Sequence, residues 1–205
     1  MPTAPVLLLS LEELAGKIRS CTLCDLHKNR TNAVPGEGPE GSDIMLIGEA
    51  PGYHEDQEGR PFVGDAGDLL TDLLKRAGLE RSDVFIGNVL KCRPPENRDP
   101  TEKEIETCSP YLEKQIRFLE PKLIVSLGRF AARLLTGRSV KVSDEHGELK
   151  DVEYAGWSCK LFVSYHPAAA LYGADARRKL EEDFDRLGEL IKDLDSFKTS
   201  KQTTF

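Results

Sequence analysis

Four short apolar runs recur along the chain and predict buried β-strands. Each is six or seven residues long, is dominated by Ile, Leu, Val, Met or Phe, and includes few charged residues. Continuous apolar runs of this length are typical of strands that are covered on both faces. The runs span residues 43–48, 84–90, 122–128 and 160–165.

Helical patterns lie between and after these runs, over about residues 65–77, 101–119, 129–135 and 175–194. The second begins with Thr101 followed by Glu104, the spacing of a capping box. The last has Leu180, Phe184 and Leu187 on one face. Alternating strands and helices predict an α/β fold with three layers, α/β/α, around a central four-stranded parallel sheet. Ligands of such sheets bind beyond the carboxyl ends of the strands.

Residues 137–159 interrupt this alternation, and glycines near two short β-branched stretches predict a surface hairpin there. Its arms would be residues 140–142 and 152–154. Residues 1–194 are predicted to form a single domain, and residues 195–205 a polar tail. The apolar run near the N-terminus is too short for a signal peptide or a membrane span, so no membrane association is expected.

The composition is that of an ordinary globular protein. Of the 205 residues, 31% are charged and 39% hydrophobic, and the formal net charge is −7. A net negative charge argues against indiscriminate coating of nucleic acid, although a local basic face can coexist with it. Since the N-terminal segment is not that of a signal peptide or a membrane span, we expect an intracellular protein. A reducing cytoplasm would keep its free cysteines available to a metal.

Four cysteines are spaced like the ligands of a metal centre. Cys21 and Cys24 form a C-x2-C pair, whereas Cys92 and Cys108 arrive singly. Thiolates suit either zinc or an iron-sulfur cluster, and the spacing leaves both open. Buried apolar cysteines or disulfides are the structural alternative. Cys159 stands apart and is predicted to be a core residue.

Polar groups follow three of the predicted strands. The segment GEAPGYHEDQEGRPFVG (residues 48–64) follows the first, Asn88 lies near the end of the second, and His166 follows the fourth. Because these strand ends meet at one edge of the sheet, we expect carboxylates, an amide, an aromatic ring and an imidazole to converge there. Such a set can hold a flat heterocycle and stabilise charge on it.

These segments, with Asn-Val-Leu-Lys-Cys-Arg-Pro-Pro (residues 88–95), His-Pro-Ala (residues 166–168) and the four cysteines, resemble family 4 uracil-DNA glycosylases over about residues 21–190. This is the iron-sulfur branch common in archaea and thermophilic bacteria. The resemblance implies an enzyme that flips deoxyuridine out of DNA and hydrolyses its N-glycosidic bond, leaving an abasic site for base excision repair. It also implies a [4Fe-4S] cluster on Cys21, Cys24, Cys92 and Cys108.

The resemblance assigns roles to three residues around the base. Asn88 would accept from uracil N3–H and donate to O4, a pattern that cytosine does not complement. His166 would donate to uracil O2, where negative charge accumulates as the bond breaks. Phe62 would stack on the base.

The resemblance assigns the positioning of the attacking water to the first loop, which comprises residues 48–64. Glu49 and Glu55 are the candidate catalytic carboxylates, and Glu55 is also a candidate for excluding the thymine methyl group. Family 1 glycosylases have an aspartate where this chain has Ala50, so positioning of the water matters more than its deprotonation. Ala50 would offer its backbone N–H.

DNA contacts are expected from residues near the pocket. Lys91, Arg93 and Arg98 would bind phosphates, with Arg177 and Arg178 as further candidates, and Leu171 would fill the gap that the flipped base leaves. The expected partner is uracil-containing DNA, single- or double-stranded, with replication or repair proteins as candidate partners. A monomer in a prokaryotic cytoplasm, associated with the nucleoid, is expected.

Two other function classes stay open at this point. One is a uracil-DNA binding module without turnover, and the other is a polymerase-accessory or redox protein of the same superfamily. Continuation of the Asn88 segment without a basic histidine-bearing insert favours turnover over covalent capture. A Rossmann nucleotide-binding protein is disfavoured, because no G-x-G-x-x-G follows the first strand.

Overall fold

The computed structural model describes residues 10–200, with side chains described to residue 192. Its strands form one five-stranded sheet in the order β2-β1-β3-β5-β4. The strands are β1 (Ile44–Gly48), β2 (Phe85–Asn88), β3 (Leu123–Leu127), β4 (Leu149–Tyr154) and β5 (Trp157–Ser164). The four predicted strands, β1, β2, β3 and β5, are present and pair with one another in parallel, and the predicted α/β class is confirmed. The prediction of four strands was wrong by one.

The additional strand, β4, pairs antiparallel with β5 at the edge of the sheet. The predicted hairpin was therefore misplaced. Its turn is at Ala155 and Gly156, both with positive φ, and its second arm is the fourth predicted strand itself. Val142, predicted as the last residue of the first arm, is instead the first residue of the short helix α6 (Val142–Glu145).

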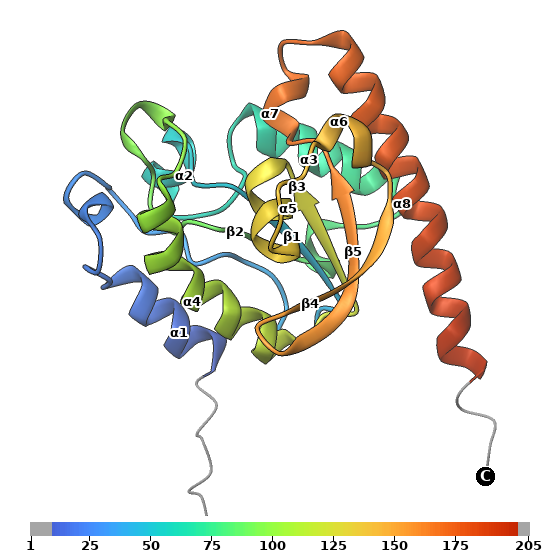
Figure 1. The fold of residues 1–205 in the computed structure, drawn as a ribbon, viewed down its shortest axis with the longest axis horizontal. Helices are drawn as coiled ribbons and strands as arrows, with labels where there is room; N and C mark the ends of the chain where they lie inside the picture. Colours follow the sequence, from blue (N-terminus) through green and yellow to red (C-terminus); the bar gives the residue numbers. More distant parts are fainter. Residues whose placement is uncertain (1–9, 201–205) are drawn as a thin grey trace, which may run out of the picture.

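Helices cover both faces of the sheet and make the three predicted layers (Figure 1). One face packs against α1 (Leu11–Arg19), α4 (Glu102–Leu119) and α5 (Arg129–Thr136), and the other against α3 (Asp65–Arg76) and α8 (Ala174–Ser200). Alternation along β1 divides its side chains between the two layers, since Met45 and Ile47 join the first core and Leu46 the second. All three are fully buried.

The helix boundaries follow local capping signals. Thr101 caps α4 and forms the predicted capping box with Glu104, and Gly137 ends α5 in a left-handed conformation. The final helix, α8, continues to Ser200, whereas the sequence predicted its end at residue 194; residues 1–9 and 201–205 lie outside the described part. No helix among the described residues is both long and apolar enough to span a membrane.

The parallel register brings the functional segments to one edge of the sheet. Gly48 pairs with Asn88 across β1 and β2, and Leu127 pairs with Ser164 across β3 and β5. Two short helices follow these strand ends, α2 (Tyr53–Glu58) after β1 and α7 (Pro167–Ala170) after β5. The chain beyond each carboxyl end is therefore held close to its neighbours, as expected for a ligand site.

Candidate active site

A cavity of about 260 Å³ lies at the carboxyl ends of β1, β2 and β5. Ligand pockets begin at roughly 300 Å³, so this volume suits one small ring system. Seven of the residues predicted from the sequence line it together: Glu49, Ala50, Glu55, Phe62, Asn88, Arg98 and His166. The remaining walls are Pro51, Gly52, Ala66, Pro94, Asn97 and Ala168.

Asn88 contributes a buried amide to this cavity. The residue is 2% exposed, and its Oδ1 has no hydrogen-bond partner among the described residues. A Cβ on Gly48, its partner across the sheet, would lie 2.4 Å from that oxygen, so glycine is required there. Buried amide oxygens are rarely left without a donor. The oxygen is therefore available to a donor on a ligand.

His166 is the N-cap of α7, and its Nδ1 accepts a hydrogen bond from the Ala168 backbone N–H at 3.1 Å. Burial lowers the pKa of His166 to about 4, although nearby Glu55 opposes this shift. The imidazole is consequently neutral near pH 7. Because Nδ1 serves as an acceptor, the proton of the neutral ring resides on Nε2, which makes Nε2 a donor.

Phe62 is 5% exposed, and its ring centroid lies 5.6 Å from that of His166, with an interplanar angle of 31°. Its φ of 51° lies in the left-handed region, which costs a non-glycine residue on the order of 1 kcal/mol or more. Arg81 holds this conformation by donating to the Phe62 carbonyl at 3.0 Å. A Cβ on Gly67 would lie 2.0 Å from the same oxygen. The backbone conformation at Phe62 therefore fixes the orientation of its ring.

Glu49 is half-buried beside the cavity, and no hydrogen bond to its carboxylate is found among residues 10–192, whose side chains are described. Burial is the main cause that raises its pKa to about 7; Asp99 adds to the shift and Arg129 opposes it. A carboxyl with a pKa near neutrality is suited to accept a proton or to orient a water.

Glu55 differs from Glu49, because its carboxylate is occupied by backbone donors. Oε2 accepts from Gly52 N–H at 3.0 Å, and Oε1 accepts from Val63 and Gly64 N–H at 3.0 and 3.3 Å. These bonds join the start of α2 to the segment that follows Phe62. Glu55 therefore fixes the shape of the loop and has less capacity to act on a water.

The four predicted ligand cysteines line a second, smaller cavity between α1, α4 and the segment after β2. Donors surround their sulfurs: Arg30 Nη1 lies 3.0 Å from Cys92 Sγ, and the Lys91 backbone N–H lies 3.3 Å from Cys108 Sγ. Within the described part of the chain, no three His, Cys, Asp or Glu side chains are arranged to hold a single metal ion. Cys159 is apart from this group and half-buried, against β4.

The profile of the uracil DNA glycosylase superfamily matches residues 35–192. The chain belongs to this superfamily. It is 49% identical to the type-4 uracil-DNA glycosylase of Archaeoglobus fulgidus, over 88% of this chain and 93% of the relative. It is 50% identical to that of Sulfurisphaera tokodaii, over 88% and 84%. The type-4 enzyme of Thermotoga maritima is 40% identical over 89% and 95%. The chain therefore falls in the type-4 branch.

In this superfamily member, Lys91 does not have the position that the sequence predicted for a phosphate contact. The residue is 1% exposed, and its Nζ donates to the Asn88 carbonyl at 2.8 Å and to Gln115 Oε1 at 2.7 Å. An ammonium with both bonds directed inward cannot reach a phosphate. The assignment of Lys91 to DNA binding was wrong.

The other predicted DNA contacts lie at the surface. Arg93 is partly exposed, bonds Asn97 Oδ1 at 2.7 Å and lies over the Tyr53 ring. Arg98 lines the cavity and is paired with Glu104. Leu171 is 36% exposed, at the end of α7. These three residues remain available to a ligand beyond the cavity mouth.

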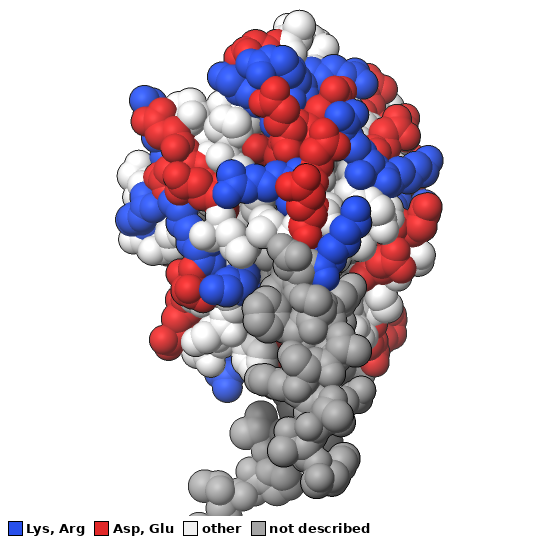
Figure 2. Space-filling view, turned by 90° about the vertical axis from the view of Figure 1, so that its right-hand side faces the viewer, with Lys and Arg blue, Asp and Glu red and all other residues white. Residues whose placement is uncertain are grey.

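Arg177 and Arg178 are in a different situation, because both lie on α8 and are paired with carboxylates of the same helix. Arg177 pairs with Glu181, and Arg178 pairs with Asp175 and Glu182. On the side of the molecule that carries α8, basic and acidic side chains are interspersed (Figure 2). Paired charges of both signs give no basic stripe for a phosphate backbone. This face does not support the suggested DNA contacts.

Several residues near the two cavities were not predicted from the sequence. Arg30 donates to Cys92 Sγ, Tyr111 lines the cavity of the four cysteines, and Gln115 binds the buried Lys91. Tyr172, beside Leu171, is 93% exposed. Tyr172 could have been singled out from the sequence, because it is an aromatic residue directly after the predicted wedge Leu171. The other three residues had no such signal, since their roles depend on tertiary contacts.

Proposed function

We propose that this protein excises uracil from DNA by hydrolysing the N-glycosidic bond of a flipped deoxyuridine. The observation that carries the proposal is the buried Asn88 amide, whose oxygen lacks a partner and lies beside a cavity suited to one ring. Uracil presents N3–H beside O4, so it satisfies both the amide oxygen and the amide N–H. Cytosine presents an acceptor and a donor in the opposite order, and would leave both pairs mismatched.

His166 would stabilise the departing base. As the glycosidic bond breaks, negative charge develops on uracil O2, and a donor positioned there lowers the barrier. The acceptor role of Nδ1 leaves Nε2–H as that donor. A neutral donor is sufficient, so the lowered pKa of the ring does not oppose this role. Phe62, held at positive φ beside His166, would stack on the base.

Glu49 is a better candidate than Glu55 for the residue that orients the attacking water. Its carboxylate has no hydrogen bond among the described residues, whereas the Glu55 carboxylate accepts from three backbone N–H groups. We assign Glu49 to orient the water that attacks the sugar and Glu55 to position the loop. Ala50 lines the same cavity, and its backbone is a candidate contact for the base.

Arg93 and Arg98 would contact phosphates flanking the flipped nucleotide, and Leu171 would enter the space left in the stack. Phosphate contacts of this kind carry no sequence preference. The proposed substrate is therefore uracil in either single- or double-stranded DNA, bound by a monomer beside the chromosome.

We further propose a [4Fe-4S] cluster on Cys21, Cys24, Cys92 and Cys108. The four thiols surround one cavity, and N–H donors to their sulfurs are typical of iron-sulfur surroundings. In a cluster the four thiolates bind different iron atoms, so their sulfurs lie farther apart than they would around a single metal ion. The role of the cluster when bound is structural, since it would connect α1, α4 and the Arg93 segment.

The cluster is tested by the colour and the iron, sulfide and zinc content of the purified protein. We expect a brown protein with stoichiometric iron and sulfide. A colourless protein from iron-replete cells that holds one zinc per chain would contradict the cluster.

The test of the proposed function uses an oligonucleotide with one uracil, incubated with purified protein and then treated with alkali to cleave any abasic site. We expect cleavage at uracil and none at cytosine or thymine in matched oligonucleotides. Binding without cleavage, at enzyme in excess over DNA, would identify a binding module instead.

A further inference from the structure

Lys91 poses an electrostatic problem that the proposed function leaves unexplained. Its side chain is among the largest fully buried ones in the described part of the chain. Its ammonium has two hydrogen-bond acceptors, the Asn88 carbonyl and Gln115 Oε1, and both are neutral. No carboxylate partner of Lys91 is found among residues 10–192, whose side chains are described. A buried lysine is rarely tolerated without a compensating negative charge.

The nearest source of negative charge is the cysteine site. Lys91 lines the same cavity as the four cysteines. Its backbone N–H contacts Cys108 Sγ, and the next residue is Cys92. Four thiolates around a cluster carry more negative charge than the iron core neutralises, so a loaded site is anionic.

The contacts of Lys91 also lead to the uracil pocket. The carbonyl that it binds belongs to Asn88, the residue whose side chain carries the proposed base recognition. Gln115 is held in its orientation because its Nε2 donates to the Pro35 carbonyl at 2.7 Å, which leaves Oε1 for Lys91. Cys108 and Gln115 lie two turns apart on α4, so one face of this helix touches Lys91 at both its backbone and its ammonium.

We propose that Lys91 is a positioning residue that couples the cysteine cluster to the uracil pocket. Its buried charge offsets the negative charge of the four thiolates, and the same ammonium holds the main chain of Asn88 in place. This inference rests on the proposed glycosylase function and on the proposed cluster. It gives the cluster an effect on base recognition that does not require electron transfer.

The test compares Lys91→Met with Lys114→Met. Both changes replace a lysine by an unbranched apolar side chain, but Lys114 is exposed on the neighbouring position of α4. Two quantities are measured on the iron-loaded proteins: the rate of iron release to a chelator, and the single-turnover rate of uracil excision. For Lys91→Met we expect iron release to be faster and excision slower, each on the order of tenfold. Lys114→Met should match the wild type in both.

A purely structural lysine is separated by Gln115→Leu, which removes one partner of the Lys91 ammonium and the bond to the Pro35 carbonyl but keeps the positive charge. Because two buried hydrogen bonds are lost, melting should fall about as far as in Lys91→Met. Under the proposal, iron release in Gln115→Leu stays closer to the wild-type rate than in Lys91→Met, because the charge is still present. Iron release at the wild-type rate in Lys91→Met, or equally fast release in both variants, would overturn the coupling, while uracil excision by the wild type would still stand.

Discussion

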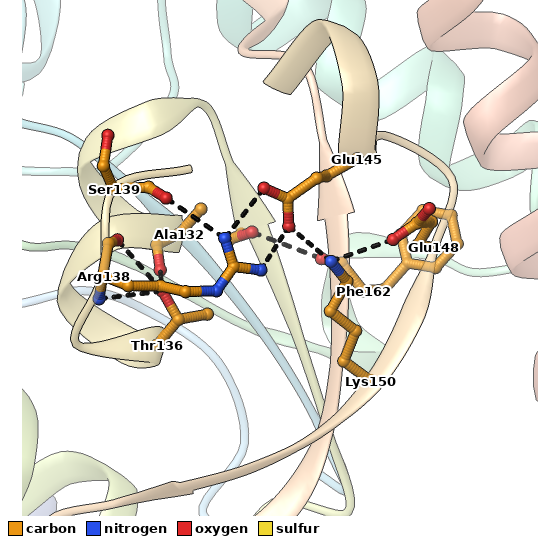
Figure 3. A network of polar contacts seen from close by, with 9 residues as sticks. Ala132, Thr136, Arg138, Ser139, Glu145, Glu148, Lys150 and Phe162 are labelled. Atoms are coloured by element: carbon orange, nitrogen blue, oxygen red, sulfur yellow. Dashed lines mark hydrogen bonds and ion pairs between the residues drawn. The ribbon is translucent and has the colours of Figure 1, made fainter. Parts of the chain in front are cut away.

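The uracil pocket and the corner around α6 differ in whether their polar side chains have hydrogen-bond or ion-pair partners within the protein. Among the described residues, neither Asn88 Oδ1 nor the Glu49 carboxylate in the pocket has a hydrogen-bond partner. At the α6 corner, which comprises Arg138, Glu145, His146, Lys150 and Asp183, every charged group is paired. Glu145 binds both Arg138 and Lys150, and Lys150 also reaches Glu148 at 2.9 Å (Figure 3).

The pairing at this corner continues into the core. His146 Nδ1 lies 2.8 Å from Asp183 Oδ1, and Ser164 Oγ donates to Asp183 Oδ2 at 2.8 Å. Asp183 is 3% exposed, and burial raises its pKa, although the bonds from His146 and Ser164 oppose the shift. The corner thus joins α8 to the end of β5, two residues before His166.

The comparison teaches how to separate function from structure in this fold. Buried or half-buried polar groups occur in both regions, so burial does not distinguish them. What differs is whether the partner belongs to the protein. A group satisfied by its own chain stabilises the fold, whereas one left without a partner is available to a ligand. Changes in the pocket should therefore affect chemistry, and changes at the corner should affect stability.

The largest effect is expected for Asn88→Asp. An ionised carboxylate cannot donate to uracil O4 and repels the charge that develops on the base. We expect the single-turnover excision rate per folded molecule to fall by roughly 10³-fold or more. The melting temperature should fall as well, because the new carboxylate is buried without a charged partner. Cytosine-containing DNA is measured in parallel, since the carboxylate accepts from its exocyclic amine. Near-native uracil turnover would remove Asn88 from recognition.

His166→Ala is expected to have the next largest effect. Loss of one donor to a developing oxyanion costs about 10²–10³-fold in rate, while binding of a non-cleavable uracil oligonucleotide should change little, because that bond strengthens as charge develops. His166→Asn retains a donor and should recover part of the rate. If melting falls in both variants while the rate per folded molecule is unchanged, the histidine is structural.

A moderate and pH-dependent effect is expected for Glu49→Gln. The pKa of Glu49 is about 7 against an ordinary value of 4.5, so wild-type excision should rise as the pH increases through 7. The variant should lack this rise and be about tenfold slower at pH 8. Because the folded pKa is raised, wild type loses stability as the pH increases through 7, and the variant should not. Parallel pH profiles for the two proteins would exclude Glu49.

Most of the sheet was predictable, because its parallel strands are buried on both faces and appear as unbroken apolar runs. β4 was not, since its sequence Leu-Lys-Asp-Val-Glu-Tyr is that of a half-exposed edge strand. Convergence of Asn88, His166 and the first loop followed from parallel topology and from the family resemblance. The burial of Lys91 could not be predicted, because it depends on the Gln115 side chain reaching it from α4.

The smallest effect is expected at the α6 corner, for Arg138→Gln. The guanidinium is about half-exposed, so solvent screens its pair with Glu145 and the melting temperature should fall only slightly. Excision should not change.

The pKa of Glu145 is lowered to about 2, with the bond from Arg138 as the first cause and that from Lys150 as the second. Its contribution is present above its ordinary pKa and is lost only as the pH falls towards 2. The difference in melting between variant and wild type should therefore stay constant from pH 5 to pH 8, the range over which Glu49→Gln diverges. An excision rate that falls with Arg138→Gln would show that this corner acts on the pocket, and the two regions could no longer be treated as separate.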